Sequence, residues 1–147
     1  MKTIAVNKKA RFDYEILDEF EAGICLVGSE VKSLRSNSAS ANEAFVSQKH
    51  GELWLNNMHI AHYKPANKLN HEATRQRKLM LHKRQIKKIA GAAKIKGLTI
   101  VVLSIYINDK GWIKAKIATG RGKKKYDKRQ DIKERDWQRK KARGIHE

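Results

Sequence analysis

Alternation of apolar and polar residues is the most frequent pattern along the chain, and it is typical of half-buried β-strands. It begins with Phe12, Tyr14 and Ile16, which are separated by acidic residues. The alternation breaks before Gly23, so a bend or bulge is expected there. Further strands are expected at residues 24–27, 45–46, 53–55 and 58–62, the second and third of them joined as a hairpin.

The most apolar strand is expected at residues 98–107, where both faces carry apolar side chains. Such a strand belongs in the centre of a sheet. Odd-numbered residues from Val101 to Ile107 should line one face, and even-numbered residues should line the other. A last strand is expected at residues 112–118, with Lys114 pointing away from the core.

Two segments have helical spacing instead. A short helix is expected at residues 30–35 after Ser29, which can cap it, and a longer helix should begin at Lys83 and end at Gly97. A linker is expected to open at Pro65. About six short strands with two or three helices predict a mainly β domain. Because closure of the sheet removes aggregation-prone edges, we expect an OB-like antiparallel β-barrel with short helices.

Residues 120–147 differ in kind from the domain expected at residues 1–119. They hold 12 basic and 5 acidic side chains but few apolar ones, so they cannot bury enough surface to become ordered alone. Residues 123–143 lack Gly and Pro and carry acid–base pairs four residues apart, which permits a helix, although Ile132 and Trp137 form no apolar stripe. A basic C-terminal tail, disordered alone and helical when bound, is therefore predicted.

The positive charge is concentrated in the second half of the chain. The formal net charge is +18; residues 1–63 carry a net of −1, whereas residues 64–119 carry 14 basic and 2 acidic side chains. A single basic cluster is often just a solvated face. Together with aromatic residues at Tyr106, Trp112 and Tyr126, these clusters predict binding to phosphates of nucleic acid. Structured RNA is favoured over duplex DNA because no recognition helix is evident.

Residues that could support catalysis or metal binding are few. His59 and His62 would point to opposite faces of a strand, and no Cys or acidic cluster completes a ligand set, so neither a metal nor another cofactor is expected. His82 with Glu21 could supply an acid and a base. A small basic ribonuclease or RNA-processing enzyme that uses His82 or His62 is therefore the alternative, and a structural ribosomal protein is a third possibility. No motif selects catalysis, so no catalytic residue is assigned.

Three features of the sequence bear on the cellular compartment. Cys25 is the only cysteine and can form no internal disulfide, which favours a reducing compartment. The longest apolar run, at residues 100–103, is too short to span a bilayer, and residues 1–9 lack the apolar stretch of a signal peptide. A soluble cytoplasmic protein without membrane contact is expected.

Several motifs match a known family in order along the chain. They are NKKAR at residues 7–11, FEAGI at 20–24, GSEVKSLR at 28–35, RKLMLHKR at 77–84, GLT at 97–99 and GKKKYDKR at 122–129. Through them the chain resembles the SsrA-binding protein (SmpB) family from end to end. The resemblance implies an OB-like barrel that binds the tRNA-like domain of transfer-messenger RNA (tmRNA, or SsrA). It further implies delivery with elongation factor Tu to stalled bacterial 70S ribosomes, for ribosome rescue and peptide tagging by trans-translation, without catalysis.

The resemblance also implies roles for individual residues. By matched position, the RNA-binding face should include Asn7, Glu21, Met80 and Lys114. Arg121, Lys123 and Lys124 are expected to contact phosphates.

The tail should act in the decoding centre and the empty mRNA channel of the ribosome, through Tyr126, Asp127, Lys128, Arg129 and Trp137. Tyr126 stands where the family often has His, so stacking on a base would replace a titrating imidazole. The protein is expected to be a monomer.

Overall fold

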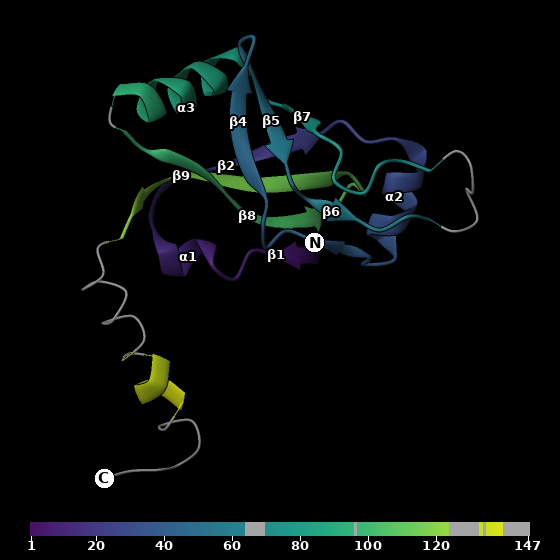
Figure 1. The fold of residues 1–147 in the computed structure, drawn as a ribbon, viewed down its shortest axis with the longest axis horizontal. Coiled ribbons are helices and arrows are strands. Elements are labelled where there is room, and N and C mark those ends of the chain that lie inside the picture. Colours follow the sequence, from purple (N-terminus) through teal and green to yellow (C-terminus); the bar gives the residue numbers. More distant parts are fainter. Residues whose placement is uncertain (64–69, 96, 124–132, 134, 140–147) are drawn as a thin grey trace.

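The computed structural model describes residues 1–63, 70–95, 97–123, 133 and 135–139 (Figure 1). Within them, the strands are β1 (Lys2–Val6), β2 (Tyr14–Ile24), β3 (Ala39–Ser40), β4 (Phe45–Lys49), β5 (Glu52–Asn56), β6 (His59–Ile60), β7 (Arg77–Met80), β8 (Thr99–Ile107) and β9 (Ile113–Gly122). The helices with assigned bounds are α1 (Ala10–Asp13), α2 (Gly28–Arg35) and α3 (Lys83–Ile95). The expected linker at Pro65 lies outside the described residues.

The strand pairings form a closed ring. The main sheet has the order β1-β8-β4-β5-β7-β2-β9 with antiparallel neighbours. A further pairing of β9 with β8 closes the six strands from β8 to β9 into a ring, and β1 pairs with β8 beside it. The small strands β3 and β6 pair separately. The prediction of a mainly β fold with short helices is confirmed, and the ring supplies the closure that removes open edges from β2, β8 and β9.

Strand β8 is central, as predicted. β9 pairs along one of its edges, while β1 and β4 share the other edge (Figure 1). The predicted division of its faces is wrong beyond Leu103, because the pairing register with β9 shifts between Val102 and Ser104. Ile105 therefore packs in the main core beside Val102, whereas Leu103 belongs to a second apolar cluster.

The beginning of the chain differs most from the expected pattern. Phe12 lies in α1 and not in a strand, and β1 pairs with β8 although no strand was predicted there. β2 continues through Gly23 without a break; the irregularity in its pairing lies between Ile16 and Asp18 instead. Helix α1 is anchored by the buried Ala10, which packs in the second apolar cluster. Tertiary packing thus overrides the local alternation.

Later elements agree better with the sequence pattern. β4 and β5 form the predicted hairpin, and its turn places His50 and Gly51 at positive φ. Helix α3 begins at Lys83 as predicted and is followed by Gly97, whose φ of 64° is typical of the residue after a helix. Strand β9 runs to Gly122, four residues beyond the predicted end of the last strand at Ala118.

A buried ion-pair network connects α2 to β7. Glu30 and Arg77 are fully buried, and the Arg77 guanidinium donates to Glu30 Oε2 and, at 2.8 Å, to the carbonyl of Met58. Arg75 Nη2 donates to Glu30 Oε1 at 2.6 Å, and the Val27 N–H donates to the same oxygen at 2.9 Å. Two of the 14 basic residues counted in residues 64–119 therefore hold a carboxylate inside the protein.

The prediction that Ser29 caps α2 is wrong. The helix begins at Gly28 after Val27, and the Ser29 hydroxyl lies 2.8 Å from Nδ1 of the buried His71. His71 Nε2 lies 2.8 Å from the carbonyl of Ile60, so the imidazole bridges α2 and β6. Nothing in the sequence pattern had indicated His71.

Among the described residues, no helix is both long and apolar enough to cross a bilayer. The same part of the chain contains no group of three or more His, Cys, Asp and Glu side chains arranged to hold a metal ion.

Candidate nucleic-acid interface

Two of the predicted RNA-binding residues meet above Gly23. In the sheet, Gly23 of β2 pairs with Met80 of β7 on one side and with Lys114 of β9 on the other. A Cβ atom at Gly23 would lie 3.0 Å from Met80 Cε and 3.8 Å from Lys114 Nζ. Because glycine has no side chain, the thioether and the ammonium group approach each other over bare backbone, and Met80 remains 52% exposed.

Glu21 lies on the same strand two residues away, so it shares the outer face of the sheet with Gly23. The Tyr106 hydroxyl of β8 donates a hydrogen bond to Glu21 Oε2. Burial, together with this hydrogen bond, raises the pKa of Tyr106, so the phenol keeps its proton and remains a donor. The exposed carboxylate of Glu21 is therefore held in one orientation by a side chain from the next-but-one strand.

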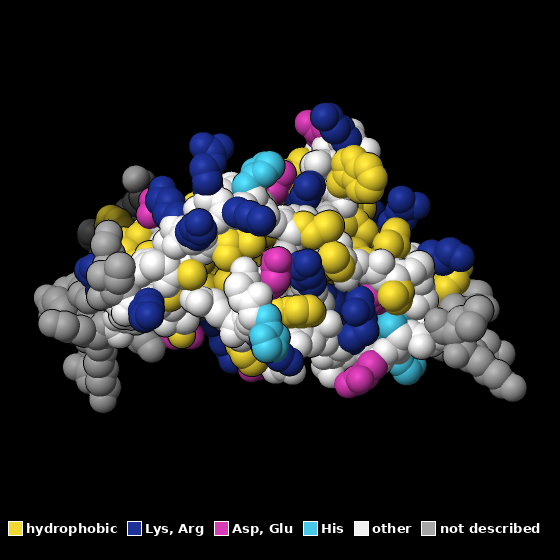
Figure 2. Space-filling view, turned by 90° about the horizontal axis from the view of Figure 1, so that it is seen from above, with side chains coloured by type: hydrophobic (Ala, Val, Ile, Leu, Met, Phe, Trp, Pro, Cys, Tyr) yellow, Lys and Arg dark blue, Asp and Glu magenta, His cyan; other side chains and the backbone are white. Residues whose placement is uncertain are grey.

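These residues line a groove. Glu21, Met80 and Lys114 surround an open hollow of about 490 Å³ that extends to His82 and Gln85 at the start of α3. Lys114 also lines two neighbouring hollows of about 250 and 510 Å³, both bordered by Trp112. We call the three hollows together the Lys114 groove. Figure 2 shows basic, acidic, histidine and apolar side chains interspersed on the face seen from above.

Helix α3 extends a basic surface from one end of the Lys114 groove. Its sequence contains no Asp or Glu, and its Lys and Arg side chains are all exposed. Lys88 Nζ also lies 5.7 Å from the centre of the Phe20 ring on β2. The surface supplies the concentrated positive charge that phosphate binding requires. It consists of Lys83, Arg84, Lys87, Lys88 and Lys94.

Asn7 is not brought together with Glu21, Met80 and Lys114. It lines a different hollow of about 320 Å³, beside Lys9, Tyr14 and Phe45. Its backbone N–H donates to the carbonyl of Leu103 at 2.9 Å, and its Oδ1 is buried without a hydrogen-bond partner among the described residues.

Two of the residues predicted to contact phosphates, Arg121 and Lys123, lie at the end of β9. Arg121 is exposed, with Nη1 3.8 Å from Glu15 Oε2, and the Lys123 N–H donates to the carbonyl of Asp13 at 2.9 Å. The structure thus fixes the backbone of both residues against β2 and α1. Lys124 lies outside the described residues.

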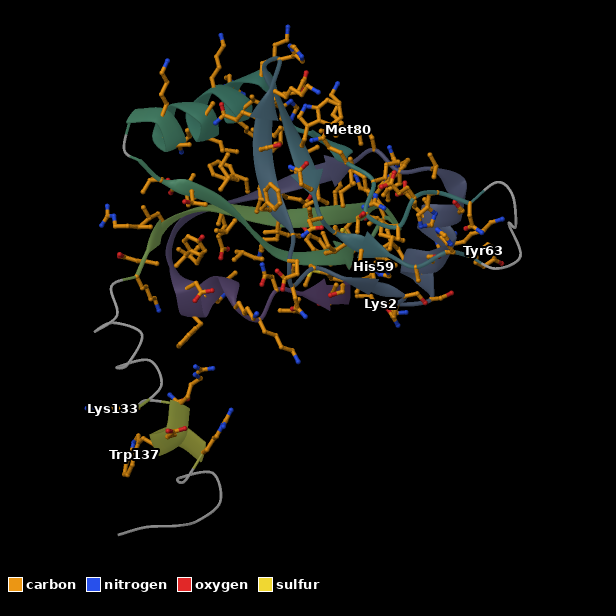
Figure 3. The ribbon with its side chains drawn as sticks, in the orientation of Figure 1. Lys2, His59, Tyr63, Met80, Lys133 and Trp137 are labelled. Carbon is orange, nitrogen blue, oxygen red and sulfur yellow. The ribbon has the colours of Figure 1, made fainter. Side chains whose placement is uncertain are left out.

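Only part of the predicted ribosome-acting tail is described. Trp137 is 61% exposed in a helical segment at residues 135–139. Figure 3 labels Trp137 and Lys133 at this segment. The guanidinium carbon of Arg135 lies 5.0 Å from the centre of the Phe12 ring. The other predicted tail residues lie outside the described part of the chain: Tyr126, Asp127, Lys128 and Arg129.

The residues of the enzymatic alternative lie in two places. His82 and Glu21 line the same hollow, but Glu21 Oε2 already accepts from Tyr106. His62 makes an edge contact with the His71 ring, with ring centres 5.6 Å apart. Glu21 and His62 thus have partners within the fold.

The comparisons with known proteins decide the family. The model of the family described as SmpB protein matches residues 4–147. The chain belongs to the SmpB family. The family prediction made from the ordered motifs is thus confirmed.

Relatives of this SmpB-family chain match it over almost its whole length. An SsrA-binding protein of Neorickettsia sennetsu is 65% identical over 143 residues, which is 97% of each chain. Another, from Wolbachia pipientis subsp. Culex pipiens, is 59% identical over 97% of this chain and 96% of its own. A solved structure described as "tmRNA-SmpB: a journey to the center of the bacterial ribosome" has a TM-score of 0.67 and 44% identity, covering 82% of this chain and 84% of that chain.

Proposed function

We propose that the protein is an RNA-binding adaptor of trans-translation, which binds the tRNA-like domain of tmRNA and delivers it to stalled ribosomes. The main support is that Met80 and Lys114 lie together over Gly23, beside a Glu21 carboxylate that Tyr106 orients. The chain is also 65% identical to an SsrA-binding protein. The comparisons do not support the ribonuclease alternative, and we assign no catalytic step to this protein.

Each residue of the Lys114 groove has a distinct part in this proposal. Lys114 neutralises a phosphate, which releases counterions and gives affinity that falls with salt. Glu21 accepts from a base amino group or a 2′-hydroxyl, the group that distinguishes RNA from DNA. Because Tyr106 fixes the carboxylate beforehand, less conformational entropy is lost on binding. Met80 offers an apolar surface to a base or a ribose.

The tail has a separate role in the proposal. Arg121, Lys123 and Lys124 contact phosphates, while the segment from Tyr126 to Arg129, with Trp137, acts in the decoding centre and the mRNA channel. The protein works in the cytoplasm as a monomer and reaches the 70S ribosome together with elongation factor Tu and the charged RNA. The division into an RNA-binding domain and a ribosome-acting tail is part of this proposal.

Substitutions in the groove test RNA recognition. We expect Glu21→Ala and Lys114→Ala to weaken binding of the tRNA-like domain of tmRNA, and Lys114→Ala to reduce the slope of log affinity against log salt by about 0.7–0.9. Filter binding at several salt concentrations measures both. Lys49→Ala, at the exposed β4–β5 turn, is the matched control and should change affinity little. Unchanged affinity in both groove variants would reject this RNA-binding face.

Substitutions in the tail test the second role. Asp127→Ala combined with Lys128→Ala should leave affinity for the tRNA-like domain nearly intact and abolish peptide tagging in a reconstituted stalled-translation reaction. A parallel loss of affinity and tagging would show that these residues take part in binding the tRNA-like domain. RNA cleavage by the purified wild-type protein, lost in His82→Ala, would instead favour a ribonuclease.

A further inference from the structure

Trp112 is a large apolar side chain that the fold holds out to solvent. It follows β8 in the turn to β9 and is 66% exposed. The turn is well fixed, because Asn108 Oδ1 accepts from the N–H groups of Lys110 and Trp112, at 3.1 and 2.9 Å, and the Asn108 N–H donates to the Trp112 carbonyl. Gly111 supplies the positive φ of 84° that the turn requires. A rigid backbone therefore presents an indole that the core does not use.

One side of this indole borders a small apolar hollow, which we call the Trp112 slot. Its volume is about 250 Å³, and its walls are Leu26, Val31, Met80 and Ile113 in addition to Trp112. This volume lies just below the range of about 300–1,000 Å³ in which whole ligands usually bind. The Trp112 slot therefore suits one planar ring and not a complete nucleotide or a duplex.

Charge at the rim of the Trp112 slot identifies the kind of occupant. Arg35 and Lys114 both line it, and none of its lining residues is acidic. An occupant should therefore combine a flat apolar ring with negative charge beside it. An unpaired nucleobase of RNA has this chemistry, because its faces stack on aromatic rings while its phosphates pair with basic side chains.

We infer that the Trp112 slot binds one unpaired nucleobase of the bound RNA, stacked on the Trp112 indole, with Arg35 and Lys114 contacting the flanking phosphates. The inference rests on the proposed RNA-binding function and assigns one of the three hollows of the Lys114 groove to a base. A slot of this kind selects an RNA with a splayed-out loop base at this distance from the main contacts. Met80 lines both the Trp112 slot and the neighbouring hollow of about 490 Å³.

The first test compares three variants of the full-length protein with the tRNA-like domain of tmRNA as the probe. Trp112→Ala should weaken binding by about 5- to 150-fold, the usual range for loss of one base–aromatic stack, whereas Trp112→Phe should retain most of the affinity. Leu17→Ala, which removes another exposed large apolar side chain, is the matched control and should bind normally. Far-ultraviolet circular dichroism and thermal melting verify that each variant is folded.

The second test identifies the base. Abasic substitutions are placed one at a time at the unpaired nucleotides of the probe. One of them should weaken wild-type binding by about the same factor as Trp112→Ala and should not weaken binding of Trp112→Ala further, because both changes remove the same contact. If every abasic substitution weakens Trp112→Ala as much as it weakens the wild-type protein, no base stacks on Trp112 and the proposed slot is overturned.

The outcomes separate the slot from the function. If the wild-type protein binds the probe and Trp112→Ala binds equally well, the slot is overturned, the RNA-binding function stands, and the hollow is left to an apolar side chain of a protein partner. If the wild-type protein does not bind the probe, the proposed function fails and the slot fails with it.

Discussion

At the scale of single residues, Glu30 shows how the interior of this basic protein is organised. Burial by itself would raise the pKa of this carboxyl, but hydrogen bonds from Arg75, the Val27 N–H and Arg77 outweigh burial and lower the pKa below its ordinary value. Glu30 is thus ionised in the folded protein, and both arginines depend on it for compensation of their charge. Removing only one partner of a buried ion pair is costly, because the other charge stays buried without compensation.

We predict that Glu30→Gln lowers the free energy of unfolding by about 3–5 kcal/mol at neutral pH, because it leaves the buried Arg77 without its counterion. Urea denaturation measures the change. Since the pKa of Glu30 is lower in the folded than in the unfolded state, its contribution is present above the unfolded pKa and is lost as the pH falls through the folded pKa. The deficit of the variant should therefore shrink in acid.

The exposed pair between Arg11 and Glu19 provides the control. Its nitrogen and oxygen are 2.8 Å apart, but both side chains are in contact with solvent. Glu19→Gln should cost less than about 1 kcal/mol. Equal losses of stability in Glu19→Gln and Glu30→Gln would contradict the conclusion that burial makes the ion pairs of Glu30 costly to break.

Individual contacts were predictable only where neighbours in sequence define them. The outward direction of Lys114 follows from alternation within one strand, and the structure agrees. Glu30 and Arg77 are 47 residues apart, and Glu21 and Tyr106 are 85 apart. Sequence spacing carries no signal for such pairs. Arg77 therefore contributed only to the positive charge of residues 64–119, and Tyr106 was indicated only as an aromatic residue that could contact nucleic acid.

At the scale of secondary-structure elements, one glycine within α3 and one just after it have opposite conformational requirements. Gly91 lies in the helix interior, where an added Cβ would meet nothing within 4 Å. Gly97 follows the helix with φ of 64°, which residues with a Cβ adopt only with strain. Alanine should therefore be favourable at the first position and unfavourable at the second.

We predict that Gly91→Ala raises the free energy of unfolding by about 0.5–1 kcal/mol, whereas Gly97→Ala lowers it by about 1–2 kcal/mol. Each variant is the control for the other, because both add the same methyl group near the same helix. Chemical denaturation measures the two changes. Changes of the same sign would mean that the added methyl groups act through something other than backbone conformation.

Elements with strong local signals were predictable, and short elements were not. The β4–β5 hairpin, α3 and β8 have clear periodicity or turn residues, and all three are present. Helix α1 has four residues and β1 has five, so packing against β8 decides their conformation. The register shifts in β2 and β8 invert alternation within a strand, and no composition rule indicates them.

At the scale of the whole molecule, β9 completes the ring. It pairs with β2 from Tyr14 to Gly23 and with β8 from Thr99 to Ile107, and its last paired residue is Gly122. The mainly β fold and the basic C-terminal segment were evident from composition and alternation. The end of the last strand was not evident, because Gly120 and Gly122 are poor strand formers. Pairing with β2, and for Gly120 also with β8, holds them extended.

We predict that a chain ending after Lys123 melts within a few degrees of the full-length protein, because it retains all strand pairings seen among the described residues. A chain ending after Ala118 loses the pairing of residues 119–122 with β2 and β8. At about 1 kcal/mol for each lost hydrogen bond, its melting temperature should fall on the order of 10 °C. Differential scanning calorimetry of both shortened chains measures the difference, and equal melting temperatures would contradict the role given to the end of β9.

The position of β9 in the chain also determines when the protein can fold during its own synthesis. Until β9 has been made, β2 and β8 each keep a strand edge that can pair with other chains. At about 5–20 residues per second, translation needs about 6–24 s to reach Gly122. The nascent chain therefore carries open edges for most of its synthesis, and a ribosome that stalls on this message before β9 releases a product prone to aggregation.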